Sequence, residues 1–426
     1  MSSCVVRPGA CQSVEDQPVR PHVACVAEVV GIPELLLAHL QEQFTGVAGQ
    51  LGGQRGVGEG HSKQYCANNG VMIGRGISTA QVQPPTVKVK DLTGPGSSAE
   101  RFGVGGTDLG IAVALADGRT GFIFGDTFDE CRAGGPGWRS PVMLRSTDTS
   151  LRTLNGGITF HDAVGGDYAR QLWDYQHDGP PWKGSGYSTV LPADAITIDG
   201  TLYLFSMVNR GLHNVLWTEI SHSDDCGDTW HDAGPDARRL GSHDDGRQQL
   251  ITWEHDPESG SVYVIASAFT RRENAFLYRV RADELLDRSA WHPSTGGWFR
   301  SDPRPLLPAG TTVGEMSLRR VENRWVFSYF ETNTGTIRVK VLDHPTDDFA
   351  KAPTTTVLRN TAWPAPRCSP PDGCTAGTLS QLYGGYIVPG STLRNLHLVV
   401  SHWNTGDGSN WPYRAIQYRH NATTGL

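Results

Sequence analysis

Several features that would quickly assign a function are missing from this sequence. No stretch approaches the ~20 consecutive apolar residues of a membrane-spanning helix, and no long basic run interrupts a chain whose formal net charge is −7. The lack of basic runs argues against nucleic-acid binding as the main activity. The most apolar early segment, residues 23–40, lacks a basic leader and a clear cleavage site, so we predict no signal peptide.

Recognisable metal and nucleophile motifs are also missing. The eight Cys form no C-x-x-C pair, and neither H-E-x-x-H nor G-x-S-x-G occurs, which speaks against a zinc ribbon, a zincin and a serine hydrolase. The Gly-rich residues 103–106 enter a strand rather than a helix, which disfavours a phosphate loop. We predict no cofactor and no metal site. Cys368 and Cys374 bracket a short loop that a disulfide would close in an oxidising compartment, and reduced thiols fit equally well.

The residues that are abundant indicate a β protein. The 426 residues include 51 Gly, 26 Pro and 12 Trp, with 38% apolar and 19% charged residues. This apolar content allows a sizeable core and argues against wholesale disorder. Many turn residues together with many aromatic residues are typical of all-β folds.

Residues 103–128 have the pattern of a β-hairpin. Two apolar strands flank the dipeptide Asp117-Gly118. This dipeptide predicts a hairpin turn, because Gly tolerates the positive φ that tight turns require. Asp108 and Asp126 occupy the outer ends of these strands, so folding brings both carboxylates to the same end of the hairpin. Opposed side chains would lie about 5 Å apart and diagonal ones about 7–8 Å, and glycosidases hold their two carboxyl groups at such separations.

These two aspartates have two interpretations. Aspartates at strand ends are common in turns, and that is the alternative to catalysis. The Gly and Thr residues beside both aspartates favour catalysis, because small residues would let a sugar ring approach closely. Converging carboxylates would also raise the pKa of one of them, which places a proton donor beside a base.

The chain divides into two parts. Residues 1–85 contain four of the eight Cys and no convincing strand pattern. Within them, residues 32–44 predict a short amphipathic helix and residues 46–60 a Gly-rich linker. From about residue 98 the pattern becomes strand, turn, strand. We therefore predict an N-terminal appendage in residues 1–85 and an all-β catalytic domain in residues 98–426.

One motif narrows the fold. Ser223, Asp225, Gly227, Thr229 and Trp230 fit the pattern S-x-D-x-G-x-T-W, known as the Asp box, which occurs on hairpins of β-propellers and notably of sialidase-like ones. The Asp side chain caps the turn, the Gly supplies its special φ, and the Trp packs into the blade. The motif is informative about the fold and says nothing about catalysis.

Hairpin units recur with a period of roughly 50–60 residues, the range expected for propeller blades. Five units predict a five-bladed β-propeller, with a two-sheet sandwich as the alternative. The first strand of each blade lines the central channel, and ligands of propellers bind at one mouth of this channel. Polar residues that we expect at the starts of these strands are therefore candidate substrate contacts. They are Asp108, Asp194, Glu254, Glu315 and the pair Tyr383 and Tyr386. A sialidase would need three Arg in such positions, and none is found there.

Five motifs together resemble a known family. They are G-G-T-D-L-G at 105–110, F-G-D-T-F at 124–128, the Asp box at 223–230, G-E-M-S at 314–317 and S-H-W-N at 401–404. In residues 98–426 the chain resembles the domain-of-unknown-function family 4185, which is linked to glycoside hydrolase family 183, the endo-D-arabinanases. The resemblance implies a five-bladed propeller that cleaves internal α-D-arabinofuranosyl linkages in arabinogalactan and lipoarabinomannan, with Asp108 and Asp126 carrying catalysis.

The resulting hypothesis is an endo-acting glycoside hydrolase whose partner is cell-envelope D-arabinan. Trp403 would contact the sugar, and Trp173, Tyr187 and Trp411 could stack on it or belong to the core. Inversion is favoured because a diagonal placement of the aspartates gives the wider gap. The expected location is outside the cell, in its envelope or on a phage particle, since family members occur in hosts and in phages. The alternatives are a non-catalytic glycan-binding propeller of the phage-adhesin type and a sialidase-like exo-glycosidase.

Overall fold

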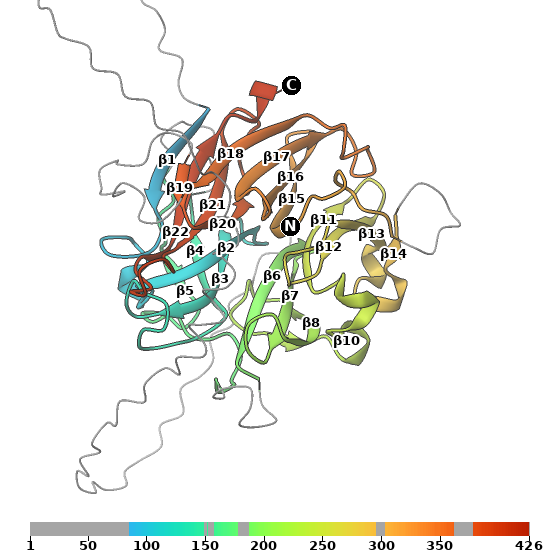
Figure 1. The fold of residues 1–426 in the computed structure, drawn as a ribbon. Coiled ribbons are helices and arrows are strands. Elements are labelled where there is room, and N and C mark those ends of the chain that lie inside the picture. The colour runs from blue at the N-terminus through green and yellow to red at the C-terminus, as the bar shows by residue number, and fades with distance from the viewer. Residues whose placement is uncertain are drawn as a thin grey trace, which may run out of the picture. The chain divides into compact units, whose positions relative to one another are not determined.

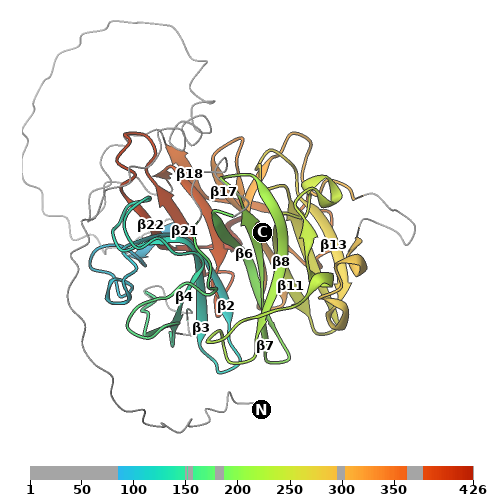
Figure 2. The ribbon, with the colours of Figure 1, turned by 90° about the horizontal axis from the view of Figure 1, so that it is seen from below.

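The computed structural model describes residues 85–148, 151, 157–177, 187–294, 303–361 and 378–425, which form five β-sheets around a common centre (Figures 1 and 2). Each sheet is one blade, so the predicted five-bladed β-propeller is confirmed. The expected N-terminal appendage, the helix predicted within it and the loop between Cys368 and Cys374 lie outside the described residues. No described helix is long and apolar enough to cross a membrane.

The strands of each blade follow one another from the channel outward. The first blade contains β2 (Gly106–Ala114), β3 (Thr120–Phe128), β4 (Val142–Ser146) and β5 (Asp162–Ala163). The second contains β6 (Thr189–Ile198), β7 (Thr201–Asn209), β8 (Val215–Ser223), β9 (His231–Asp232) and β10 (Arg239–Leu240). The third contains β11 (Leu250–Asp256), β12 (Ser261–Ser267), β13 (Phe276–Arg281) and β14 (His292–Pro293).

The last two blades complete the circle. The fourth contains β15 (Val313–Val321), β16 (Arg324–Glu331), β17 (Thr336–Leu342), β18 (Thr354–Thr361) and β19 (Thr378–Ser380). The fifth contains β20 (Leu382–Ile387), β21 (Leu396–Trp403), β22 (Tyr413–His420) and β1 (Thr86–Asp91). The described helices are single 3₁₀ turns: η2 (Glu100–Phe102), η3 (Pro235–Ala237), η4 (His243–Gly246), η5 (Ala282–Glu284), η6 (Arg288–Ala290) and η7 (Ala422–Gly425).

The circle is closed by strands from both ends of the described chain. The innermost strands β2, β6, β11, β15 and β20 pack against one another in a ring. Strand β1 pairs antiparallel with β22 and forms the outer edge of the fifth blade. The propeller therefore includes residues upstream of position 98, where its start was expected. The alternating Lys residues of β1 suit an edge strand that is half exposed.

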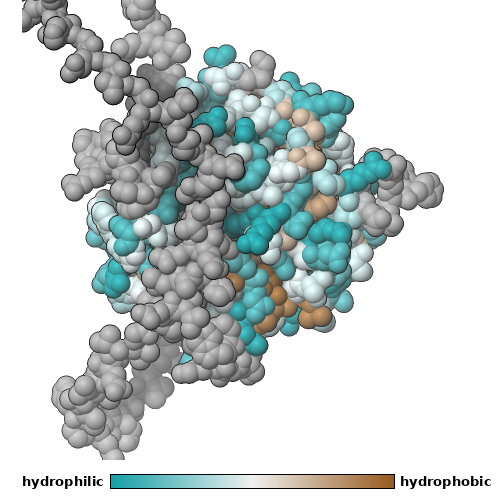
Figure 3. Space-filling view, in the orientation of Figure 1, coloured by the Kyte–Doolittle hydropathy of each residue, from teal (hydrophilic) through white to brown (hydrophobic). Residues whose placement is uncertain are grey.

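Burial follows the position of a strand in its blade. Strands near the channel are covered on both faces by neighbouring blades, so they contain runs of consecutive buried residues rather than a strict alternation. Phe122, Ile123 and Phe124 of β3 are consecutive and all buried. On the face shown in Figure 3, the described surface is mostly hydrophilic and its apolar residues form small patches.

The Asp box folds as its sequence predicts. Asp225 accepts hydrogen bonds from the backbone N–H of Thr229 at 2.8 Å and from the Thr229 hydroxyl at 2.6 Å. Gly227 has a φ of +94°, and the Trp230 indole donates to its carbonyl at 3.0 Å. Trp230 packs against a hydrophobic core cluster to which the first, second, fourth and fifth blades contribute.

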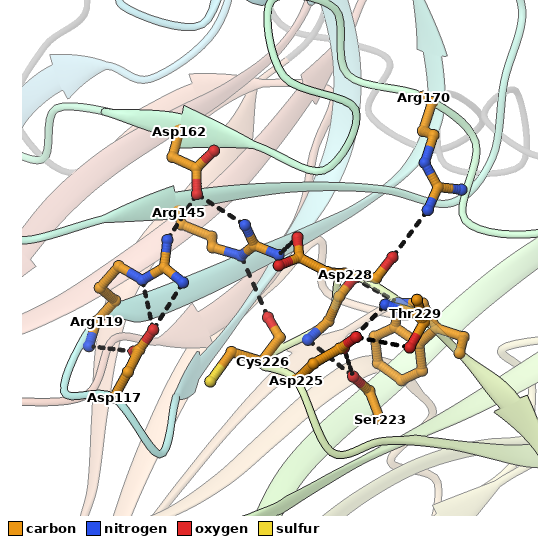
Figure 4. A network of polar contacts seen from close by, with 12 residues as sticks. Asp117, Arg119, Arg145, Asp162, Arg170, Ser223, Asp225, Cys226, Asp228 and Thr229 are labelled. Atoms are coloured by element: carbon orange, nitrogen blue, oxygen red, sulfur yellow. Dashed lines mark hydrogen bonds and ion pairs between the residues drawn. The ribbon is translucent and has the colours of Figure 1, made fainter. Parts of the chain in front are cut away.

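The Asp box also joins two blades (Figure 4). Buried Arg145 of β4 donates to the Cys226 carbonyl at 3.2 Å and pairs with Asp228, both in the Asp-box turn. Its other guanidinium nitrogen pairs with Asp162 of β5 at 2.7 Å, and Arg119 reaches the same carboxylate at 2.6 Å. The motif in the second blade thus holds the first blade, and it takes no part in the candidate site.

Candidate active site

Asp108 and Asp126 lie where the pairing of β2 with β3 is irregular. Thr107 pairs with Thr127, and Leu109 pairs with Phe124, so Asp108 lies opposite the Gly125–Asp126 step. This extra residue is a β-bulge, a device that re-aims side chains beside active sites. The two aspartates are therefore neighbours across the hairpin, and the diagonal placement that favoured inversion is not observed.

The small residues around the aspartates are required by the packing of the chain itself. A Cβ on Gly125 would collide with Oδ1 of Asp108, and a Cβ on Gly105 or Gly106 would collide with the backbone of residues 129–130. Thr107 and Thr127 are buried and hydrogen-bonded to each other at 2.7 Å. The expectation that Gly and Thr would let a furanose ring approach was wrong, because neighbouring chain already occupies that space.

The bulge is held by a residue from another motif. Leu109 and Gly110 both have positive φ values, +64° and +85°, and this conformation turns the Leu109 N–H away from β3. The buried hydroxyl of Ser401 on β21 accepts that N–H at 2.8 Å. The first residue of the S-H-W-N motif therefore fixes the backbone beside Asp108.

Asp108 lies in surroundings that favour its protonated form. Tyr383 of β20 donates to Oδ2 at 2.9 Å, whereas Oδ1 is buried and has no hydrogen-bond partner among the described residues. Burial raises the pKa of Asp108 to about 7, and the charges of Asp126 and Glu315 act in the same direction, while hydrogen bonds from Tyr383 and Tyr413 oppose it. Part of the side chain remains exposed, as a proton donor to a substrate requires.

Asp126 has more donors around it. Its Oδ1 accepts hydrogen bonds from the Trp138 indole and from the Thr189 hydroxyl, both at 2.8 Å. Burial raises the pKa of Asp126, and the two hydrogen bonds and the nearby His177 lower it. Asp126 also remains partly exposed. The two carboxyl groups are thus close together in different environments, the arrangement that separates an acid from a base.

Glu315 belongs to the same end of the channel. It is 2% exposed, lies in a bulge of β15 and pairs with Arg271 at 2.5 Å. The Arg271 guanidinium also lies over the ring of Tyr383, 5.7 Å from its centroid. Tyr386 is buried further along β20 and interacts electrostatically with both Glu315 and Asp108. Of the expected residues, Asp108, Asp126, Glu315, Tyr383 and Tyr386 form one electrostatic cluster.

Asp194 has a different role. It lies in the middle of β6, is 0% exposed and forms a two-pronged ion pair with Arg319 of β15 at 2.6 and 2.9 Å. It also accepts from Thr252 of β11 at 2.6 Å. The expectation that Asp194 stands at a strand start and faces substrate was wrong. Both of its carboxylate oxygens accept hydrogen bonds that join the second, third and fourth blades.

The expectation that Glu254 stands at the start of a strand was also wrong. It lies near the end of β11 and lines a cavity of about 240 Å³ together with Arg319 and Arg320 at the end of β15. Asp108 and Glu315 stand at the opposite ends of their strands. Burial raises the pKa of Glu254 to about 7, but the residue lies at the other mouth of the channel from the two aspartates.

Comparison with known proteins identifies the family. Residues 93–419 match the family described as Domain of unknown function (DUF4185). The chain belongs to the DUF4185 family.

DUF4185 relatives occur in bacteria and fungi. The chain is 31% identical to an uncharacterized 35.9 kDa protein in the asd 3′ region of Mycolicibacterium smegmatis, covering 78% of this chain and 97% of the relative. It is 29% identical to Notoamide biosynthesis cluster protein J′ of Aspergillus versicolor, covering 74% and 86%. A crystal structure from Bacteroides ovatus superposes with a TM-score of 0.51 at 12% identity, covering 75% of this chain and 87% of that one, which shows a shared fold.

The aromatic residues of this DUF4185 site differ from those the sequence suggested. Trp403 is only partly exposed and packs edge-on against Tyr413, with ring centroids 5.7 Å apart. Trp138 beside Asp126 is 37% exposed, and Trp411 is 57% exposed. Trp411 belongs to a loop that contacts the segment after β3, where Ala133 donates to the Asn410 carbonyl at 3.2 Å. Trp411 offers an exposed aromatic face to a sugar, whereas His177 and Phe128 stack on the ring of Trp138.

Sequence reasoning missed Trp138, Thr189, His177 and Arg271. Trp138, Thr189 and His177 surround Asp126, and Arg271 pairs with Glu315. One signal was present for Trp138, which follows F-G-D-T-F closely in a Gly-rich segment. Among the described residues, no group of three or more His, Cys, Asp or Glu side chains could hold a metal ion. The groups gathered around Asp108 and Asp126 are carboxyl groups, tyrosines and an arginine.

Proposed function

We propose that this DUF4185 protein is a glycoside hydrolase that uses Asp108 as general acid and Asp126 as base or nucleophile. The observation that carries the proposal is a pair of neighbouring aspartates, each partly exposed as a residue, whose carboxyl groups lie in unequal environments. Glycoside hydrolysis needs one carboxyl group to protonate the leaving oxygen and another to activate water or attack the anomeric carbon.

The division of labour follows from the contacts of each carboxyl group. Oδ1 of Asp108 has no hydrogen-bond partner in the described part of the chain, and the carboxyl group faces two like charges, Asp126 and Glu315, which favours the neutral acid. A carboxyl with a pKa of about 7 can hold a proton and release it near neutral pH. Asp126 accepts two hydrogen bonds from neutral donors, which favours the carboxylate.

The finer proposal concerns the substrate. We infer that the enzyme cleaves internal α-D-arabinofuranosyl linkages of cell-envelope arabinan, on the strength of the motifs it shares with the endo-D-arabinanases. Those motifs occupy positions with identifiable duties here: G-G-T-D-L-G and F-G-D-T-F build the bulge, and Ser401 of S-H-W-N holds it. The exposed ring of Trp411 suits the stacking of a sugar ring of the polymer.

The experiment that tests this proposal is incubation of the purified chain with arabinogalactan, followed by assay of reducing ends. The account predicts cleavage to oligosaccharides and a loss of about 10²- to 10⁴-fold in kcat for D108N and for D126N, the range for removing a general acid or base. The matched control is D199N, at an exposed turn position with φ +49° that Asn tolerates. It should keep full activity.

Three outcomes would contradict parts of the proposal. Binding to the polysaccharide without cleavage would indicate a glycan-binding propeller and end the enzymatic account. Release of single sugars would indicate exo action. Cleavage that survives in D108N and D126N would remove both aspartates from the mechanism.

A further inference from the structure

His177 lies between two hydrogen-bond acceptors. Its Nδ1 is 2.7 Å from the backbone carbonyl oxygen of Ser188, and its Nε2 is 2.9 Å from Oε1 of Gln171. A neutral imidazole has one N–H and one lone pair, so it can satisfy only one of two acceptors. Both contacts are hydrogen bonds only if both ring nitrogens carry protons.

The contact between His177 and Gln171 cannot be resolved by flipping the Gln171 side-chain amide. Its Nε2 donates to the carbonyls of Trp173 at 2.8 Å and Tyr175 at 2.9 Å, and its Oε1 also accepts the Ser140 N–H at 3.2 Å. Flipping the amide would set Oε1 against two carbonyl oxygens and the amide nitrogen against an N–H. Three backbone groups therefore fix Oε1 as the acceptor that faces His177.

His177 is connected to Asp126 through Trp138. The imidazole stacks on the indole with centroids 3.9 Å apart and planes inclined by 22°, and Phe128 also stacks on Trp138 at 6.3 Å. The indole N–H donates to Oδ1 of Asp126 at 2.8 Å. His177 also acts directly on the Asp126 carboxylate through its charge.

We propose that His177 is a positioning residue that, as an imidazolium, orients Trp138 and supplies the positive charge that keeps the Asp126 carboxylate ionised. The inference rests on the proposed role of Asp126 as base or nucleophile. Protonated His177 satisfies the Ser188 and Gln171 acceptors, holds the indole flat and stabilises a neighbouring negative charge. Loss of its proton sets a lone pair against one acceptor and removes that charge.

The surroundings of His177 define what titrates with it. Among the described residues, the titratable groups that face it are Asp126 on β3 and Tyr175 in its own segment, whose ring centroid is 4.9 Å away. Burial raises the pKa of Tyr175, so this tyrosine stays neutral. Burial lowers the pKa of His177 below its usual value, and the Ser188 carbonyl and the Asp126 carboxylate offset only part of this lowering. Asp126 is thus the one charged partner among these groups.

A titration of the full chain tests the protonation without any need for activity. Histidine side chains labelled with ¹⁵N would be followed by NMR from about pH 5 to 8, and His177 would be assigned by its loss in H177F. The proposal predicts an imidazolium over the acidic part of this range, and a titration of His177 mirrored at the Asp126 carboxyl carbon. A neutral His177 throughout, or a titration without response at Asp126, would overturn it.

The pH dependence of activity provides a second test. H177F keeps an aromatic ring on Trp138 but removes the charge, so the pKa of Asp126 should rise and the acidic limb of the kcat/KM profile should move to higher pH. H344F is the control, because His344 is exposed and packs edge-on against Tyr263. It should leave the limb in place. A uniform loss at every pH in H177F would indicate a merely structural role. If no glycan is cleaved, the proposed function fails, and the NMR arm still decides the state of His177.

Discussion

At the scale of single residues, the site is built from polar groups that the fold leaves incompletely satisfied. The buried Oδ1 of Asp108 and Oε2 of Glu315 have no hydrogen-bond partner among the described residues. Unsatisfied buried polar atoms reduce stability and in native proteins commonly mark function. Their arrangement explains how one carboxyl group can stay protonated beside another that is ionised.

This arrangement predicts a dependence of stability on pH. The pKa of Asp108 rises from 3.8 to about 7 on folding, so the folded protein holds a proton that the unfolded chain releases. The free energy of unfolding should therefore fall as pH rises from about 4 to about 7. Above that range, the full cost of burying the Asp108 carboxylate should be present. D108N removes the cost, so it should raise Tm at about pH 8 and change it little at about pH 4.

Thermal unfolding of D108N at both pH values measures this effect. D199N, at an exposed turn, is the control and should not alter the difference. A lower Tm for D108N at about pH 8 would show that the Asp108 carboxylate stabilises the fold and would remove the physical basis of its role as an acid.

At the scale of structural elements, the bulges decide where the side chains point. The hairpin, its Asp117-Gly118 turn and the apolar strands were predictable, because turn dipeptides and apolar runs are local signals. The bulges opposite Asp108, before Asp194 and around Glu315 were not, since nothing local marks an inserted residue. Asp108 and Glu315 lie near the starts of β2 and β15 as expected, whereas Asp194 lies in the middle of β6 and Glu254 near the end of β11.

The dependence of the bulge on Ser401 is testable. In S401A the buried N–H of Leu109 loses its acceptor, which should cost about 1–3 kcal/mol of unfolding free energy and also lower activity, because Asp108 is the neighbouring residue. The matched control is S206A. Ser206 is equally buried in β7, and its hydroxyl has no partner among the described residues. Chemical denaturation should show a loss for S401A and little or none for S206A, and equal losses would contradict this account of the bulge.

At the scale of the whole molecule, the blades are joined by buried polar contacts across the channel. Arg319 of β15 donates to Asp194 of β6, to the Trp253 carbonyl of β11 at 3.2 Å and to the Ala112 carbonyl of β2 at 3.2 Å. It therefore links the first four blades. The period of the hairpins predicted five blades, whereas a contact between positions 194 and 319 could not be read from local pattern.

The ion pair should matter for stability and little for substrate binding. D194A leaves the Arg319 charge buried without its partner, which should cost about 3–5 kcal/mol, with KM unchanged at temperatures where the variant is folded. The control is D283N in the exposed pair with Arg281, which should leave the free energy of unfolding nearly unchanged because solvent screens the pair. Denaturation and kinetics of both variants provide the check. A large rise in KM for D194A would return Asp194 to the substrate contacts.

The central claim is the division of roles between Asp108 and Asp126, and the most direct test is the response of each variant to the leaving group. An arabino-oligosaccharide with a nitrophenolate leaving group needs no protonation from the enzyme, whereas an internal linkage does. The account predicts that D108N loses activity on arabinogalactan but keeps most of it on the activated substrate, and that D126N loses both. Retention of the activated reaction by D126N, with its loss in D108N, would reverse the assignment.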